Sequence, residues 1–193
     1  MQQRKDERYT YADYITWDDG NRYELIDGEV YMMDAPKRVH QGISGAIFWR
    51  IAAYLEGKPC EVYAAPFDVR LNADAEDDTV VQPDISVICD PSKLDDRGCV
   101  GAPDMVVEIL SPSSAEYDQG VKLNRYLEAG VRECWIVNPM HRFVQVNLLR
   151  DGEYHMRPYG DADAVPVSVL DGCVIELAKV FPAVPPEPEV APE

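Results

Sequence analysis

Two acidic residues lie inside apolar runs that are typical of buried β-strands. Asp84 belongs to the run VVQPDISVIC, and Glu108 belongs to DMVVEIL. Burying a lone carboxylate is costly unless a cation, a hydrogen-bond donor or a metal meets it. If the two runs are neighbours in one sheet, both carboxylates can bind one divalent cation, and Mg²⁺ favours such oxygen ligands. A metal held there could activate a water for attack on phosphorus. Alternatively, each acid caps a strand end or pairs with an arginine.

Lys122 and Glu24 are the next candidates. Lys122 lies about two turns into the predicted helix after the Glu108 strand, so its ammonium can reach back to orient or deprotonate a water, or to neutralise developing charge. Alternatively, it faces solvent and pairs with Asp118 four residues earlier. Period-two alternation places Glu24 on the inward face that it shares with Ile26. It could bind the metal or a water, or equally accept a hydrogen bond from a nearby donor.

His40, near the start of a long predicted helix, could contact a phosphate or a carboxylate such as Glu24, although an ordinary helix-start histidine also explains it. No two histidines are close in sequence, so the spacing of a zinc hydrolase is absent. The serines of 111–114 fit a helix cap better than a nucleophile, because no Gly-x-Ser-x-Gly motif is present. Phosphate-binding glycine loops are absent as well.

The elements that must position these residues follow from hydrophobic periodicity and turn signals. A short helix is expected from Thr10 to Trp17, and a hairpin over 22–31 turns on Asp27-Gly28. The remaining predicted elements are a helix over 39–56, strands over 60–65, 67–71, 80–89 and 104–110, a helix over 114–129 with a capping box at Ser113–Glu116, a strand over 133–137, a hairpin over 143–157, and strands over 165–169 and 174–177.

The segment over 104–137 predicts that two strands of the sheet are parallel. The strand over 104–110, the helix over 114–129 and the strand over 133–137 together have the length of a β-α-β crossover, which joins parallel strands. From residue 39 to 138 the expected order is helix, three strands, helix, strand. The stretch over 90–103 is expected to be a connection.

Composition limits the class of protein. The chain of 193 residues is 46% hydrophobic and fits one domain over 1–181, followed by a Pro- and Glu-rich tail over 182–193 that we expect to be disordered. It has no apolar run of roughly 20 residues and no secretory signal, which predicts a cytoplasmic protein without a membrane span. Five cysteines without a Cys-x-x-Cys spacing predict mostly buried, reduced thiols. A net charge of −17 argues against a nonspecific nucleic-acid coat protein, but not against an enzyme that acts on nucleic acid locally.

Several segments in this order resemble the Uma-type family of restriction endonucleases, which in turn resembles the PD-(D/E)xK nuclease superfamily. The segments are YELIDGEV, His40, QPDISVI, PDMVVEILSPSS, the D-x-x-x-K-x-x-x-Y spacing of Asp118, Lys122 and Tyr126, and GVRECWIVNP. They span roughly residues 10–160. The resemblance implies an α/β fold with a restriction-endonuclease-like αβββαβ core, a mixed central sheet flanked by helices. The N-terminal hairpin and the extra C-terminal strands predicted above would be added to this core.

The resemblance also implies a site. Asp84 matches the acid of the Pro-Asp element and Glu108 the second acid, and the backbone carbonyl of Ile109 could be a further metal ligand. The superfamily places a lysine two residues after the second acid, where this chain has Leu110, so Lys122 would replace it from the following helix. Glu24 would match an additional acid ahead of the core.

The predicted activity is therefore Mg²⁺-dependent hydrolysis of DNA phosphodiester bonds, with Mn²⁺ as a substitute metal. A homodimer would supply two sites for cutting both strands. The alternatives are a catalytically silent nuclease fold that acts as a binding or regulatory module, and a metal-dependent hydrolase of a small phosphorylated substrate.

Overall fold

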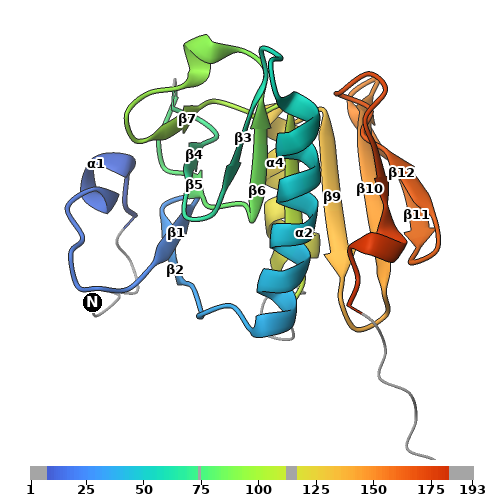
Figure 1. The fold of residues 1–193 in the computed structure, drawn as a ribbon. Helices are drawn as coiled ribbons and strands as arrows, with labels where there is room; N and C mark the ends of the chain where they lie inside the picture. Colours follow the sequence, from blue (N-terminus) through green and yellow to red (C-terminus); the bar gives the residue numbers. More distant parts are fainter. Residues whose placement is uncertain (1–7, 74, 112–116, 183–193) are drawn as a thin grey trace, which may run out of the picture.

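A computed structural model describes residues 8–73, 75–111 and 117–182 (Figure 1). Its centre is a six-stranded mixed sheet in the order β11-β10-β9-β8-β6-β3. Strands β8 and β9 are parallel, and the other neighbours in this sheet are antiparallel. The strands are β3 (Glu61–Ala64), β6 (Ile85–Ile88), β8 (Met105–Ile109), β9 (Glu133–Asn138), β10 (Phe143–Arg150) and β11 (Glu153–Gly160).

A second, five-stranded sheet carries the N-terminal hairpin. Its order is β2-β1-β5-β4-β7, and only the β4-β7 pair is parallel. The strands are β1 (Tyr23–Ile26), β2 (Glu29–Met32), β4 (Asp68–Arg70), β5 (Val80–Val81) and β7 (Gly98–Val100). The predicted hairpin is confirmed, with its turn at Asp27-Gly28, where both residues have positive φ.

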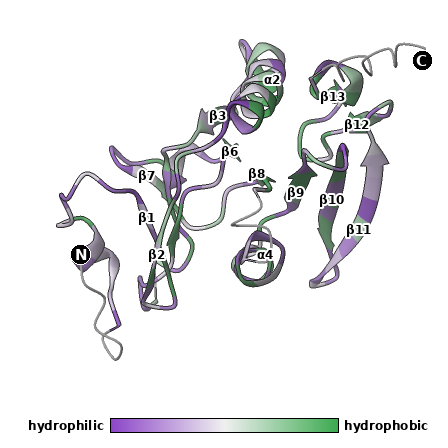
Figure 2. Ribbon diagram, turned by 90° about the horizontal axis from the view of Figure 1, so that it is seen from below, coloured by the Kyte–Doolittle hydropathy of each residue, from purple (hydrophilic) through white to green (hydrophobic). Residues whose placement is uncertain are grey.

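The central sheet has a helix on each face (Figure 2). Helix α2 (Arg38–Leu55) covers one face, and α4 (Leu123–Ala129) covers the other. A π-helical turn, η2 (Asp118–Lys122), leads directly into α4, and Gly130 ends it in the left-handed conformation, as expected. The smaller elements are α1 (Tyr11–Tyr14), the 3₁₀ turns η1 (Pro91–Lys93) and η3 (Leu177–Lys179), and the hairpin of β12 (Ala164–Pro166) and β13 (Val174–Glu176).

Strand alternation divides the core in two. On β8, Met105, Val107 and Ile109 pack in the cluster that contains the buried isoleucines of α2. Val106 packs in the cluster on the α4 side, so Glu108, two residues further along the strand, also faces α4. The predicted parallel crossover is confirmed, because β8 pairs with β9 through η2 and α4. The order α2, β3, β6, β8, α4, β9 is the predicted αβββαβ core.

Two predictions about strands were wrong. The run over 80–89 is not one strand: β5 lies in the five-stranded sheet and β6 in the six-stranded sheet. Pro83, which has no N–H to donate to a ladder, lies at the break. The connection over 90–103 contains β7, whose polar neighbours concealed it; Gly98 lets the backbone approach β4, since an added Cβ would lie 2.1 Å from the carbonyl oxygen of Asp68.

The prediction of reduced cysteines needs a correction. Cys60 and Cys89 form a disulfide, because they continue the antiparallel register of β3 and β6 by one residue beyond Glu61 and Ile88. The other three, Cys99, Cys134 and Cys173, are buried free thiols, as expected. No helix in the described ranges is long and apolar enough to cross a membrane. The capping box at 113–116 and the tail over 183–193 lie outside the described residues.

Candidate active site

The site lies where β8 ends and β6 begins. The pairing of Ile85 with Val107, carried one residue further, puts Asp84 opposite Glu108. Directly opposed residues of antiparallel strands have Cβ atoms about 4.5–5.5 Å apart. The Ile109 amide donates to Asp84 Oδ2 over 2.8 Å. The two predicted acids are thus neighbours, and Asp84 also has the strand-end contact that was the alternative interpretation.

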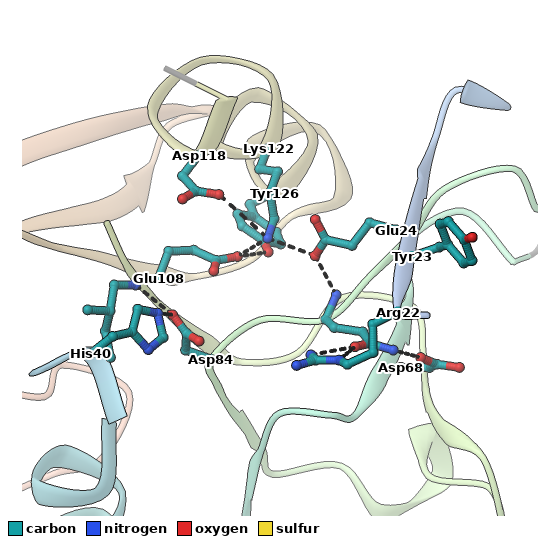
Figure 3. Close-up of polar contacts among 12 residues, drawn as sticks. Arg22, Tyr23, Glu24, His40, Asp68, Asp84, Glu108, Asp118, Lys122 and Tyr126 are labelled. Carbon is teal, nitrogen blue, oxygen red and sulfur yellow. Dashed lines mark hydrogen bonds and ion pairs between the residues drawn. The ribbon is translucent and has the colours of Figure 1, made fainter. Parts of the chain in front are cut away.

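Lys122 lies at the centre of the acids (Figure 3). Its Nζ is 2.7 Å from Glu108 Oε1, 2.8 Å from Glu24 Oε1 and 3.8 Å from Asp118 Oδ1. Its side chain is only 2% exposed, so the solvent-facing alternative is wrong. The contact with Asp118 exists, but it is the longest of the three. The π-helical turn that contains both residues projects this lysine across the end of the sheet.

Glu24 is buried, as strand alternation predicts, and it accepts hydrogen bonds from nearby donors, while its binding of a metal or a water stays a prediction. Its Oε1 contacts Lys122 and also accepts the Gln82 amide over 2.7 Å. The Gln82 side chain is in turn fixed by donation from Arg22 and by its own donation to Tyr14 and Asp68, each at 3.0 Å or less. The N-terminal hairpin therefore delivers its acid to the edge of the central sheet in a fixed orientation.

His40 and Tyr126 complete the arrangement. His40 Nε2 lies 3.1 Å from Asp84 Oδ2, so its carboxylate partner is Asp84 rather than Glu24. The Tyr126 hydroxyl donates to Glu108 Oε1 from inside the sheet–α4 interface, where the tyrosine is fully buried. Tyr126 follows Lys122 by four residues, so both lie on the face of the helix that meets Glu108.

Acids outnumber cations in this site, and the pKa values reflect it. Burial raises the pKa of Glu108 to about 8; Lys122 opposes that rise, and Asp118, Asp84 and Glu24 add to it. Burial alone would lower the pKa of Lys122, but the charges of Glu108, Glu24 and Asp118 outweigh it and hold that pKa well above its usual value. The lysine is therefore charged, and Glu108 takes up a proton more readily than an exposed glutamate.

Burial acts on His40 in the same direction as on the lysine. It lowers the pKa of the imidazole, but the hydrogen bond and charge of Asp84 outweigh it, with help from the backbone of Ile109, so the net shift is upward. The Asp84 carboxylate therefore favours the protonated form of His40.

The donor set fits a divalent metal in part. The oxygens Asp84 Oδ1 and Glu108 Oε2 accept no hydrogen bond from the described residues, so each carboxylate has one oxygen to offer. Within the described ranges, no group of three or more Asp, Glu, His and Cys side chains is arranged to hold a metal ion. Mg²⁺ typically uses one or two carboxylates and keeps several waters, which this pair of acids can satisfy.

Sequence reasoning assigned no contact to Gln82 and did not identify Asp84 as the partner of His40. Gln82 precedes the Pro-Asp pair directly, and its position at the break between β5 and β6 is what brings its amide to Glu24. Tyr126 had a local signal, because the Asp118, Lys122, Tyr126 spacing of four residues places all three on one helix face.

Comparisons with known proteins bear on the family and on the fold. The model of the Uma2 family, described as "Putative restriction endonuclease", matches residues 11–178. A crystal structure titled as a "putative nuclease belonging to DUF820", from Anabaena variabilis, superposes with a TM-score of 0.74 over 90% of this chain and 97% of that chain, at 18% identity. An uncharacterized protein of Synechocystis, slr1290, is 30% identical over 116 residues, which span 59% of this chain and 60% of the relative's length.

Proposed function

The chain belongs to the Uma2 family, and from this premise we propose that it is a Mg²⁺-dependent DNA endonuclease of the PD-(D/E)xK type. The observation that carries the proposal is the convergence of Glu24, Glu108 and Lys122 beside Asp84 at one end of the central sheet. These groups come from four separate segments of the chain. A purely structural core has no need to gather several acids in one buried place, because each buried charge costs free energy.

The excess of negative charge supports a divalent cation. Four acids meet one lysine and one histidine, and the raised pKa of Glu108 means that its ionised form lacks full compensation. A dipositive ion beside Glu108 and Asp84 would favour the ionised form of Glu108 and lower its pKa. Asp84, Glu108 and the backbone carbonyl of Ile109 are the groups that we propose to hold Mg²⁺, or Mn²⁺ in its place.

Each residue then has a distinct role. Bound Mg²⁺ would supply an acidified water and a polarised phosphoryl oxygen. Lys122 can donate from its ammonium to a phosphate oxygen or to the attacking water, and stabilise the charge that develops on the phosphoryl group. Glu24, fixed by the Gln82 amide, holds that ammonium beside Glu108.

One observation favours a second candidate, a silent nuclease fold that acts as a binding or regulatory module. The Lys122 ammonium already lies between Glu24 and Glu108, where it neutralises them without any metal. The net charge of −17 also weakens attraction to DNA.

Cleavage of supercoiled plasmid and of linear duplex DNA with Mg²⁺, Mn²⁺ or EDTA separates the candidates. We expect metal-dependent nicking or linearisation that Asp84→Asn abolishes, and that the exposed control Asp96→Asn retains. A panel of small phosphoesters is run alongside. Hydrolysis of those alone would replace the DNA assignment, and inactivity on every substrate with intact folding would favour the silent module. Sedimentation with and without DNA tests the proposed homodimer.

A further inference from the structure

His40 has polar contacts that helix stability does not require. It lies in the first turn of α2, on the opposite face of the central sheet from α4, yet its Nε2 reaches 3.1 Å from Asp84 Oδ2 (Figure 3). The imidazole is 14% exposed and the Asp84 side chain 18%, so the contact is largely shielded from water. A carboxylate oxygen can only accept a hydrogen bond, so Nε2 carries a proton and is the hydrogen-bond donor to Asp84.

The other ring nitrogen of His40, Nδ1, has no hydrogen-bonding role among the described residues. It is also buried. A buried nitrogen without a partner costs free energy, which an apolar side chain of similar size would avoid. Histidine at this position is thus explained by what Nε2 does for Asp84 and not by packing.

Two donors on one oxygen fix the Asp84 carboxylate. The Ile109 amide and His40 Nε2 both point at Oδ2, one from β8 and the other from α2. Strand β8 and helix α2 therefore together fix the plane of the Asp84 carboxylate. Oδ1, which accepts nothing from the described part of the chain, is left directed away from both donors.

We propose that His40 is a positioning residue that holds the Asp84 carboxylate through Oδ2, so that Oδ1 stays available to bind the divalent cation. The inference rests on the proposed function, since it assigns a role toward the metal of that same site. Outer partners of metal-binding carboxylates fix ligand orientation in this way, and their loss typically weakens metal binding 10- to 100-fold.

The test is Mn²⁺ binding to the full chain by titration calorimetry, without DNA, in four variants. His40→Gln can place an amide N–H where Nε2 lies, whereas His40→Asn is equally polar but one methylene shorter. His40→Ala removes the donor, and His155→Ala, an exposed histidine of β11, is the control. Folding is checked by circular dichroism and thermal melting for each protein.

We expect His40→Ala and His40→Asn to weaken Mn²⁺ affinity about 10- to 100-fold, and His40→Gln and His155→Ala to stay within about threefold of the unaltered chain. If His40→Ala fails to fold, the Gln–Asn pair decides alone. Equal affinity of the Gln and Asn variants would overturn the positioning role while the metal site stands. Absence of saturable Mn²⁺ binding to the unaltered chain would overturn both this role and the proposed function.

Discussion

Two buried glutamates on neighbouring strands have opposite surroundings. Glu108 on β8 and Glu133 on β9 are both almost fully buried in the central sheet. Glu108 follows the apolar residues MVV, and Glu133 begins the apolar run ECWIV. Glu133 pairs with Met105, three residues from Glu108 and thus about 10 Å away along the strands. Glu133 accepts from Trp135 Nε1 over 2.7 Å and from the Val169 amide over 3.0 Å.

The difference lies in the partners. Neutral donors satisfy Glu133, and no basic side chain bonds to it in the described ranges, so it serves the packing of β9 against the C-terminal segment. Glu108 shares Lys122 with Glu24 and Asp118. A fourth acid, Asp84, lies opposite Glu108 on the neighbouring strand side. Burial thus identifies neither acid as functional; the crowding of like charges around one cation is what distinguishes Glu108.

Substitutions of Glu108 and Glu133 should differ most in their effect on nuclease activity. We expect Glu108→Gln to reduce Mg²⁺-dependent DNA cleavage by more than the 100-fold that is roughly the upper range for outer partners of a metal ligand. Glu133→Gln should retain most activity, because position 133 lies about 10 Å from Glu108 along the strands, even though a single amide oxygen can accept from only one of Trp135 and Val169. Plasmid nicking rates at saturating Mg²⁺ measure both, and comparable losses in the two variants would erase the distinction.

Substitution of Lys122 should have the next largest effect, a decrease in the free energy of unfolding. Lys122→Met leaves Glu24 and Glu108 without their cation, and breaking a buried ion pair typically costs about 3–5 kcal/mol. Urea denaturation measures the free energy of unfolding, with Lys179→Met, an exposed lysine paired with Glu176, as a near-neutral control. Combining Lys122→Met with Glu108→Gln should recover part of the loss; strict additivity of the two changes would show that the pair is not coupled.

The pH dependence of stability should separate the two glutamates. The folded-state pKa of Glu108 is about 8, above the usual value of 4.5, so the folded chain binds more protons than the unfolded chain between those pH values. The free energy of unfolding of the metal-free protein should therefore fall as pH rises from about 4.5 to about 8. Burial also raises the pKa of Glu133, which adds a decrease of the same sign.

Each substitution to glutamine should flatten this dependence, and saturating Mg²⁺ should remove only the part that belongs to Glu108. Denaturation curves at several pH values, with and without Mg²⁺, measure the slopes. An unchanged slope in Glu108→Gln would mean that its carboxyl is ionised throughout.

The smallest effect concerns Tyr126. Tyr126→Phe removes the hydroxyl that donates to Glu108 but leaves the lysine in place, so we expect a loss of about 1 kcal/mol in the free energy of unfolding. Urea denaturation checks it. A loss as large as that of Lys122→Met would mean that the tyrosine, rather than the lysine, is the main partner of Glu108.

Much of the fold could be predicted from local patterns. The hairpin at Asp27-Gly28, the long helix and the parallel crossover all depend on residues close in sequence, and the structure confirms them. The break at Pro83 and strand β7 were missed, because both depend on pairing with strands of a second sheet. The disulfide was missed for the same reason: only the register of β3 with β6 brings Cys60 to Cys89.

The candidate site was predictable as a set of residues but not as a network. Acids within apolar runs identified Asp84 and Glu108, although the same rule applied to ECWIV would have selected Glu133. The contact of His40 with Asp84 and that of the Gln82 amide with Glu24 join segments 44 and 58 residues apart, and no local pattern encodes them. The catalytic roles, the metal, the cytoplasmic location and the homodimer stay predictions.

The most direct measurement is a crystal of the full chain soaked in Mn²⁺, with anomalous diffraction recorded. We expect one strong peak between the carboxylates of Asp84 and Glu108, with Lys122 beside it, and no peak at Glu133. Absence of a peak at that position, with the Lys122 ammonium still bridging Glu24 and Glu108, would contradict this expectation.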